Sequence, residues 1–326
     1  MQMKAVELTG TEGFKSLRLA KVPKPTPGAT EILIEVKAAG LNYAEIEQTR
    51  GKYPVFKPLP FVMGFEASGI VSEVGSEVKS WRVGDRVAAI VSSGGYAEYA
   101  LADASAAIPI QNGTSFAEAT AITIQGLSAY ALLKLAAKPQ PQETVLIQAA
   151  AGGVGLFLVQ LSKILGVKRV IALASTEEKL ALAKELGADV AISYANGDWA
   201  GQVREVTGGQ GADVVLECAS GAVGEQSFKL IAPFGRVVVF GAKNMYDTIS
   251  PEKLQQLIHK NQSLIGFNFP SLRPNQIAPC IFELLDLISR GRVRLFANNS
   301  FPLAEFETAF EALSGRRTIG KVVLIP

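Results

Sequence analysis

The sequence predicts an α/β protein with a doubly wound parallel sheet and a separate β-rich part. From about residue 123 to 265, strand-like and helical segments alternate, which is typical of a parallel sheet with helices on both faces. Residues 1 to about 120 hold short β-branched runs between glycines and prolines, which indicate a compact barrel or sandwich. At 326 residues the chain is too long for one average domain, so we expect two.

The composition argues against several classes of partner. Lysine and arginine number 32 against 30 acidic residues, so no excess charge indicates nucleic acid or an anionic membrane. We see no apolar run approaching the roughly 20 residues needed to span a bilayer, and no apolar leader follows Met1. The two cysteines, Cys218 and Cys280, exclude a disulfide framework. We therefore expect a cytoplasmic protein.

The β-rich part is justified by its short apolar runs. The expected strands are Ile32–Lys37, Ala67–Val74 and Arg86–Val91. They are separated by Gly and Pro punctuation, and helical patterning begins at Phe116.

The alternating part follows in order from residue 144. The expected elements are the strand Thr144–Ile147, the helix Val154–Leu165, the strand Val167–Leu173, the helix Glu177–Leu186, the strand Asp189–Ile192, the helix Trp199–Val206 and the strands Ala212–Glu217, Gly235–Phe240 and Ser263–Phe267. Gly187 follows the second helix as a left-handed cap. Repeated βα units of this kind predict a Rossmann domain.

The remaining residues hold one amphipathic helix, Ile277–Ser289, and a final strand, Lys321–Pro326. This strand has no partner nearby in the sequence, so we expect it to return to the first domain. The predicted domains are a β-rich domain of residues 1–122 completed by residues 266–326, and a dinucleotide-binding domain of residues 123–265.

The strand–turn–helix at residues 144–165 carries the most specific motif. Its fingerprint positions are Ala150, Gly152 and Gly155, with Gly153 and Val154 between them. Ala150 suits a tight turn, Gly152 lets the backbone approach a pyrophosphate, and Gly155 lets the helix pack on the strand. The phosphates face the helix N-terminus. The alternative is a glycine-rich turn that holds no ligand.

The second strand of this domain indicates which nicotinamide cofactor binds. A preference for NAD usually places an acid about 20 residues beyond the fingerprint, and the strand end Ala172–Thr176 has none. Ser175, Lys179 and Tyr194 are candidates to contact a 2′-phosphate, which favours NADPH. Each has another explanation: a capping box of Ser175 with Glu178, a solvated lysine, and loop packing of the tyrosine.

Ordered motifs along the whole chain carry a family resemblance. They run from Met3 to Pro326 and include Ala39–Tyr43, Gly51–Pro54, Gly64–Val71, Val83–Val87, Gly95–Tyr99 and Gln125–Tyr130. With these motifs the chain resembles the medium-chain dehydrogenase/reductase superfamily, and within it the zinc-free quinone oxidoreductases of the zeta-crystallin type. The resemblance implies a GroES-like β-rich catalytic domain, a Rossmann NADPH-binding domain, and a homodimer formed through the sheet edge near Gly235–Phe240.

The same resemblance implies that no metal is bound. Zinc-dependent relatives have a cysteine where this chain has Asn42, a histidine where it has Phe65, and a four-cysteine lobe where Val91–Tyr96 closes the region. A catalytic zinc takes three protein ligands and a structural zinc takes four. The one histidine, His259, ends a predicted helix at residues 251–260, and Cys218 is interpreted as a small buried hydrophobe.

Without a metal, hydride transfer is easier to an acceptor whose own conjugation spreads the developing charge. The leading hypothesis is NADPH-dependent quinone reduction. A second is reduction of the C=C bond of an α,β-unsaturated carbonyl or enoyl thioester, for which Arg273, Arg316 and Arg317 offer a basic rim. A third, from another class, is an NADPH-binding structural protein like the crystallins of this family.

By resemblance, Asn42 and Tyr53 are the catalytic residues beside the nicotinamide. Asn42 would bond to the cofactor or to a substrate oxygen, and Tyr53 would pack over the site or donate to a developing oxyanion. The alternatives are a turn asparagine and a packing aromatic before Pro54. Glu47 stands where the family has a second tyrosine, so this part of the family's quinone site is altered.

Further cofactor contacts are expected at the carboxyl ends of strands, where such folds bind ligands. Phe240–Gly241 follows the fifth strand and Phe267–Asn268 follows the sixth. Ser128 would contact the nicotinamide end of the cofactor from the first helix of the Rossmann domain. Lys321 would approach the cofactor diphosphate, or is a surface lysine of the last strand.

Overall fold

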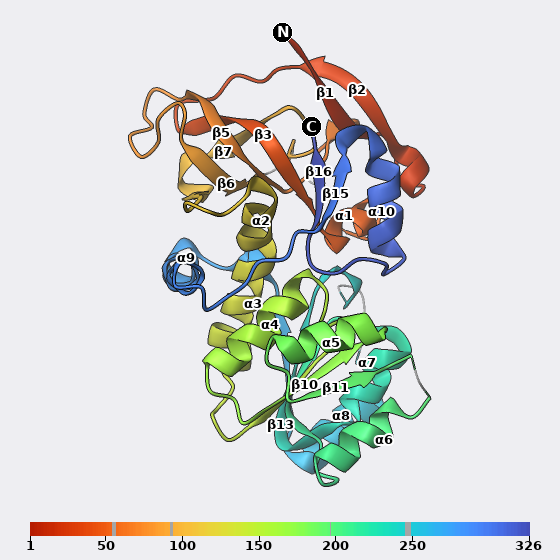
Figure 1. The fold of residues 1–326 in the computed structure, drawn as a ribbon. Helices are drawn as coiled ribbons and strands as arrows, with labels where there is room; N and C mark the ends of the chain where they lie inside the picture. The colour runs from red at the N-terminus through yellow and green to blue at the C-terminus, as the bar shows by residue number, and fades with distance from the viewer. Residues whose placement is uncertain (54–56, 92–93, 196, 245–248) are drawn as a thin grey trace. The chain divides into compact units, whose positions relative to one another are not determined.

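The computed structural model describes residues 1–53, 57–91, 94–195, 197–244 and 249–326 (Figure 1). The chain forms two compact units. The first unit comprises Met1–Ile124 and Leu295–Pro326, and the second comprises Gln125–Arg294. The first unit is therefore discontinuous, as the sequence predicts.

The first unit is built on a seven-stranded sheet and a three-stranded sheet. The larger sheet has the order β15-β16-β3-β5-β6-β8, with β7 also paired to β3. Its strands are β3 (Glu31–Leu41), β5 (Glu66–Val74), β6 (Arg86–Ile90), β7 (Tyr99–Asp103), β8 (Ala107–Pro109), β15 (Asn299–Pro302) and β16 (Val322–Ile325). The smaller sheet has β1 (Gln2–Leu8) between β2 (Leu17–Pro23) and β4 (Phe61–Val62).

One apolar core joins both sheets of the first unit. It includes Leu8 from the small sheet, Ile34 from the large one, and the fully buried Tyr96 and Phe310, whose rings meet edge to face. The unit's helices are α1 (Tyr43–Thr49), α2 (Phe116–Ala121) and α10 (Phe306–Ser314). The predicted return of the last strand is confirmed, because β16 pairs with β3 in antiparallel register, Val323 opposite Gly40.

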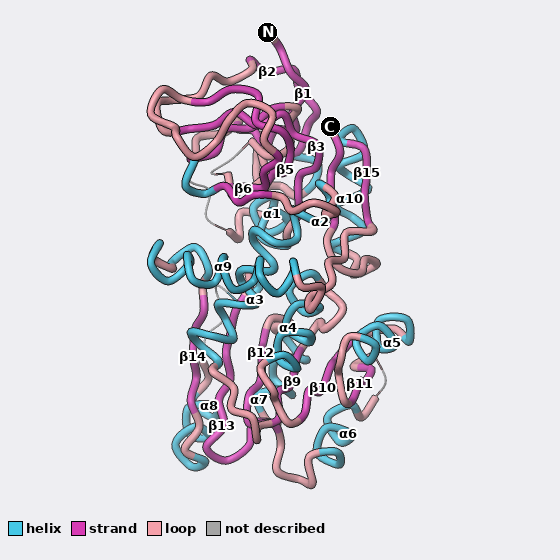
Figure 2. The backbone as a smooth tube through the Cα atoms, turned by 60° about the vertical axis from the view of Figure 1, so that its left-hand side comes forward, coloured by secondary structure: helices cyan, strands magenta, loops and turns pink. Residues whose placement is uncertain are grey.

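The second unit is a six-stranded parallel sheet. Its strands are β9 (Thr144–Ile147), β10 (Arg169–Ala174), β11 (Val190–Ser193), β12 (Ala212–Glu217), β13 (Ile231–Phe240) and β14 (Ser263–Phe267). Figure 2 shows them side by side in the order β11-β10-β9-β12-β13-β14. Numbered within the unit this order is 3-2-1-4-5-6, that of a Rossmann domain.

The helices of the second unit agree closely with the sequence pattern. They are α3 (Leu127–Ala131), α4 (Gly153–Ile164), α5 (Glu177–Glu185), α6 (Trp199–Val206), α7 (Gly221–Phe228), α8 (Pro251–Lys260) and α9 (Pro274–Ser289). Trp199 of α6 and Phe228 of α7 share a core cluster with the strand residues Leu146 and Val215. Gly187 follows α5 with φ +114°, as the predicted cap requires.

The domain boundary expected at residue 266 differs from the division of the structure, which falls after Arg294. The reason is the packing of α9. The Tyr130 hydroxyl, on α3, donates a hydrogen bond to the Glu283 carboxylate on α9. A Cβ on Gly126 would lie 3.1 Å from the Leu284 side chain, so the two helices are in close contact. The amphipathic pattern of α9 predicts a buried face but not the surface that covers it.

One helical stretch is longer and more apolar than the sequence analysis predicts. Residues 116–137 form a continuous 22-residue helical stretch in which π-helical segments, η3 (Ile122–Gly126) and η4 (Leu132–Ala137), flank α3. Among the described residues it is the helix long and apolar enough to cross a membrane, contrary to our expectation that no such run exists. Because 78% of its apolar window is buried, it has the character of a core helix.

The predicted sheet edge near Gly235–Phe240 is not an edge of the described sheet. Residues 235–240 lie in β13, which is paired with β12 on one side and β14 on the other. The interior position of β13 leaves β14 (Ser263–Phe267) as the outer strand at this side of the described sheet.

Candidate functional site

The glycine-rich turn of the second unit has the geometry its fingerprint predicts at Gly155. A Cβ there would lie 2.2 Å from the Ala149 carbonyl oxygen and 2.8 Å from the backbone of Ala150. Since both are backbone atoms, no side-chain movement relieves the overlap. Ala149 itself has φ +46°, and the Gly152 N–H donates to its carbonyl over 2.8 Å. Gly155 therefore lets α4 pack directly on the turn after β9.

Gly152 differs from Gly155 in what constrains it. Its φ is −76°, and a Cβ would lie 3.1 Å from the Ala149 carbonyl oxygen and 4.0 Å from the Ala149 Cβ. The backbone conformation does not demand a glycine here, and the Cβ contact is looser than the one at Gly155. Gly152 precedes α4, whose first N–H groups, from Gly153 and Val154 onward, lack carbonyl partners within the helix. This geometry suits the close approach of an anion.

Gly153 has a different role, which sequence reasoning missed. A Cβ on it would lie 2.0 Å from the Gln125 side chain, so the glycine admits Gln125 against the start of α4. Ser128 lies further along the same helical run and is buried. Its predicted contact with a nicotinamide stays a prediction.

Ser175 and Tyr194 follow neighbouring strands at the same edge of the sheet. Ala174 at the end of β10 pairs with Ser193 of β11, and the Tyr194 N–H donates to the Ala174 carbonyl over 3.1 Å. The predicted capping box of Ser175 is wrong, because Thr176 caps α5 and accepts from the Lys179 N–H at 3.4 Å. Tyr194 also packs partly against the core.

The ends of β13 and β14 lie side by side, because Phe240 pairs with Phe267. This register brings Phe240–Gly241 next to Phe267–Asn268, and their contacts with a cofactor stay predictions. Gly241 has φ +85°, and a Cβ on it would lie 3.6 Å from Cys218 at the end of β12. Cys218 is half-buried rather than a fully buried hydrophobe, which corrects our interpretation.

Two further residues that the sequence analysis missed hold the turn after β12. The Gln148 Oε1 atom accepts from the N–H groups of Cys218 (3.1 Å) and Ala219 (2.9 Å). The Glu217 carboxylate accepts from Ala219 (2.9 Å) and Ser220 (2.7 Å), and also from the Gln148 amide. Both side chains are buried. A polar residue at the end of an apolar strand is the signal that was available for each.

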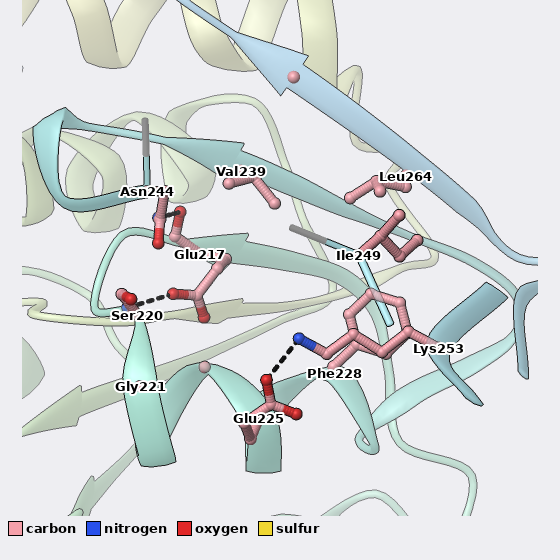
Figure 3. A pocket seen from close by; sticks show the side chains of 12 residues that line it. Glu217, Ser220, Gly221, Glu225, Phe228, Val239, Asn244, Ile249, Lys253 and Leu264 are labelled. Carbon is pink, nitrogen blue, oxygen red and sulfur yellow. Dashed lines mark hydrogen bonds and ion pairs between the residues drawn. The ribbon is translucent and has the colours of Figure 1, made fainter. Parts of the chain in front are cut away.

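A pocket of about 220 Å³ lies beside this turn (Figure 3). Its apolar wall includes Phe228, Val239 and Leu264. Its polar side includes Lys253, which forms a 2.6 Å ion pair with Glu225 and lies over the Phe228 ring. The sequence analysis singled out none of these residues.

A buried ion pair forms the centre of the candidate site of the first unit. The Lys321 ammonium pairs with the Glu66 carboxylate, and both side chains are 0% exposed. The ammonium also donates to Asn42 Oδ1 over 2.8 Å, while Asn42 Nδ2 donates to Glu66 Oε1 over 2.8 Å. The interpretation of Lys321 as a surface lysine is therefore wrong. Its predicted approach to a cofactor diphosphate stays a prediction.

Gly40 makes room for this pair. A Cβ on Gly40 would lie 2.4 Å from Lys321 Cε and 2.5 Å from Glu66 Oε1. The Glu66 Oε2 atom accepts from the Thr123 hydroxyl and from the Ile124 N–H at 3.1 Å. Both carboxylate oxygens of Glu66 thus have partners, as a buried charge requires.

Glu45 is a second buried carboxylate beside this pair. It accepts from the Asn42 N–H over 2.7 Å and from the Phe65 N–H over 3.0 Å. Burial raises the pKa of Glu45 to about 7, against the opposing effect of the Lys321 charge. Burial likewise raises the pKa of Tyr96 well above its usual range, with the Glu45 charge as the next cause.

Tyr53 packs beside Phe65, with ring centroids 6.2 Å apart. Burial, and then the charge of Glu45, raise the pKa of Tyr53 above its ordinary value. The structure thus brings Tyr53, Phe65, Glu45 and Asn42 together. Pro54, which enters the packing alternative for Tyr53, lies outside the described residues.

Comparison with known proteins agrees with this architecture. Residues 28–112 match the family described as alcohol dehydrogenase GroES-like domain, and residues 153–289 match the family described as zinc-binding dehydrogenase. A quinone oxidoreductase of Pseudomonas aeruginosa is 34% identical over 329 residues, which cover 99% of each chain. The chain belongs to the quinone oxidoreductase group of the medium-chain dehydrogenase/reductase superfamily.

Solved structures of this superfamily superpose on the whole chain. The quinone oxidoreductase of Escherichia coli, complexed with NADPH, has a TM-score of 0.91 at 31% identity and covers 99% of this chain and 100% of its own. The quinone oxidoreductase of Thermus thermophilus, also solved with NADPH, has a TM-score of 0.85 at 36% identity with the same coverage.

An amide and a phenyl ring stand at the two positions where the family resemblance places the catalytic zinc ligands of zinc-dependent relatives. Asn42 is held by Lys321 and Glu66, and Phe65 packs against Tyr53. Within the described ranges, no group of three or more His, Cys, Asp or Glu residues is close enough to hold a metal ion.

Two other residues named from the sequence, His259 and Glu47, lie on helices. His259 is exposed near the C-terminal end of α8, where a helix end favours a cation. Glu47 is buried and forms a 2.9 Å ion pair with Arg50.

Proposed function

We propose that this protein is an NADPH-dependent oxidoreductase that transfers hydride to a quinone without a metal ion. The observation that carries the proposal is the glycine-rich turn, packed on α4 through Gly155, at the centre of a Rossmann sheet. It occurs in a chain whose full-length relatives include quinone oxidoreductases, two of which were solved with NADPH.

The cofactor would lie along the carboxyl edge of the second unit's sheet. The pyrophosphate would bind at Gly152–Gly155 and the start of α4. Ser175, Lys179 and Tyr194 would surround the 2′-phosphate, since the end of β10 carries no acid to repel it. The residues expected at the nicotinamide end share their position at this edge or on α3; they are Ser128, Phe240–Gly241 and Phe267–Asn268.

When bound, NADPH supplies the hydride. The chain's part is to orient the reactants, to exclude water and to hold a proton near the acceptor oxygen. Tyr53 suits the last task, because a phenol is a hydrogen-bond donor and this one packs beside Phe65 in the same cluster as Asn42. Asn42 would bond to the cofactor or to the substrate oxygen.

Metal independence is supported by the donor set at the zinc-ligand positions. A phenyl ring at position 65 offers no lone pair, and the Asn42 oxygen already accepts from an ammonium. A quinone needs no Lewis acid, because its conjugated ring spreads the charge that a hydride brings.

We also propose a cytoplasmic homodimer without nucleic-acid or membrane partners. The formal net charge of +2 supports no strong attraction to either. The dimer would extend the sheet through the outer strand β14, whose residues are exposed or half-buried, rather than through residues 235–240.

The test is NADPH oxidation against a benzoquinone, a naphthoquinone, an alkenal and crotonyl thioester, each repeated with NADH and with a chelator. We expect turnover with the quinones and NADPH, unaffected by chelation. Turnover confined to the alkenal or thioester would favour the second candidate, and NADPH binding without any turnover the structural-protein candidate. Activity only with NADH, or loss on chelation restored by zinc, would contradict the proposal.

A further inference from the structure

We propose that Lys321 and Glu66 are positioning residues that lock the side-chain amide of Asn42 in a single orientation. The inference rests on the proposed function only in that Asn42 then serves the reaction. The locking itself is a property of the first unit and can be tested without any cofactor.

The orientation follows from the chemistry of the two partners. Asn42 Oδ1 accepts from the Lys321 ammonium at 2.8 Å, and Asn42 Nδ2 donates to Glu66 Oε1 at 2.8 Å. An ammonium has only donors and an ionised carboxylate only acceptors. A flipped amide would set its N–H groups against the ammonium and its oxygen against the carboxylate. Both contacts would then be repulsive, so one orientation is strongly favoured.

Burial makes this preference large. Lys321 and Glu66 are 0% exposed, and Asn42 is buried with them. Water therefore cannot replace a lost partner, and interactions between charges are stronger here than at a surface. The ammonium also draws electron density from the Asn42 carbonyl, which makes the amide N–H groups stronger donors.

The surrounding chain is shaped to hold the pair. Gly40 leaves the space that Lys321 Cε and Glu66 occupy, and Thr123 and Ile124 fix the second carboxylate oxygen. A buried ion pair is weak evidence for stability, because apolar residues of similar volume often replace one without loss. Retaining charges at this depth is better explained by the order they impose on Asn42.

The test combines a spectroscopic and a kinetic measurement on the full chain. The variant E66Q/K321M removes both charges at similar volume, and N42A identifies the Asn42 side-chain signal in protein labelled with 15N-asparagine. In wild type we expect that signal to be shifted from those of exposed asparagines and slow to exchange its hydrogens. In E66Q/K321M it should move toward the exposed values. An unchanged signal would overturn the proposal, whatever the activity shows.

The kinetic arm is a double-mutant cycle. We expect E66Q/K321M to lower kcat roughly tenfold or more, since a misplacement of about 1 Å can cost about 100-fold. In the N42A background the same pair of substitutions should have little further effect, because the group they position is absent. An equal fall in both backgrounds would show a general structural role and contradict the proposal.

A milder variant covers the case in which E66Q/K321M does not fold. Thr123→Val removes the hydroxyl that donates to Glu66 and leaves both charges in place. It should shift the Asn42 signal in the same direction by a smaller amount, and no shift would count against the proposal. If wild type turns over no acceptor while the Asn42 signal behaves as expected, the proposed function fails and the locking stands.

Discussion

The two candidate sites of this protein are built in opposite ways. The glycine-rich turn of the second unit is made by backbone atoms of consecutive residues, Ala149 to Gly155. The cluster of the first unit is made by side chains far apart in sequence, with Lys321 lying 279 positions from Asn42 and 255 from Glu66. A site made of local backbone geometry leaves a motif in the sequence. A site made of distant side chains leaves only scattered polar residues.

The two sites also differ in where their polar groups face. The N–H groups at the start of α4 lack partners within the helix, as an anion site requires. The charges of the first unit are paired with one another away from solvent. Substitutions in the glycine-rich turn that leave its packing intact should therefore affect ligand affinity. Substitutions in the cluster of Lys321, Glu66 and Asn42 should first affect stability.

The largest expected effect is that of Gly40→Ala. Its Cβ would overlap Lys321 Cε and Glu66 Oε1, so the ion pair must separate or shift. Breaking a buried pair costs about 3–5 kcal/mol, and we expect a loss of that size in the free energy of unfolding by urea denaturation. Gly266→Ala is the matched control, because a Cβ there meets no atom within 4 Å. Equal stability of the two variants would refute the account of Gly40.

Glu45 should give the first unit a characteristic pH dependence. Its pKa is about 7 in the folded state against an ordinary 4.5, so between these values the unfolded chain binds fewer protons than the folded one. The free energy of unfolding should then fall as pH rises through this window, by at most about 1.4 kcal/mol per pH unit from this group, and level off above it. Comparison with Glu45→Gln isolates the contribution, and identical slopes would contradict it.

Gly155→Ala should act on the second unit through packing. Its Cβ would overlap the Ala149 carbonyl and the Ala150 backbone, so α4 must move away from the turn. Such overpacking typically costs about 1–3 kcal/mol. We expect a stability loss of this size together with weaker NADPH binding, measured by fluorescence titration.

Gly152→Ala should separate affinity from stability. Because its Cβ would lie 3.1 Å from the Ala149 carbonyl oxygen, a looser contact than at Gly155, we expect stability to change by less than about 1 kcal/mol. NADPH affinity should nevertheless fall about tenfold, equivalent to about 1.4 kcal/mol, if the pyrophosphate approaches this backbone. Unchanged affinity would show that the cofactor lies elsewhere.

The smallest expected effect is the stability loss that shows whether Thr176 or Ser175 is the N-cap of α5. Thr176→Ala removes the N-cap of α5 and should cost about 1 kcal/mol of stability. Ser175→Ala should cost less, and it should instead narrow the preference for NADPH over NADH. A larger stability loss for Ser175→Ala than for Thr176→Ala would show that Ser175 is the N-cap, as the sequence pattern predicts.

The fold was predictable where it depends on local pattern. The helices at Trp199–Val206 and Pro251–Lys260 and the strands at Ala212–Glu217 and Ser263–Phe267 agree with the sequence residue for residue. The domain boundary could not be predicted from the sequence, because the apolar face of α9 does not reveal that its partner is α3. The N-cap of α5 could not be predicted either. Ser175 and Thr176 both carry a hydroxyl that can cap a helix, and the backbone conformation decides between them.

The candidate sites follow the same division. Gly152 and Gly155 were readable from spacing, whereas the pairing of Lys321 with Glu66 depends on strands that meet only in the folded sheet. One signal was present: Gly40 lies inside the strand β3, and a glycine inside a strand often marks a close approach. What approaches it could not be deduced from the sequence.

The return of β16 to the first unit has a consequence for the order of folding during synthesis. On the ribosome, residues 125–294 emerge in full before residues 295–325, which complete the first sheet. Until then Glu66 has no ammonium to neutralise it, and the edge of β3 that receives β16 is open. We expect protease resistance of ribosome-stalled nascent chains to appear in the Rossmann unit first and around β3 only after β16 has left the exit tunnel.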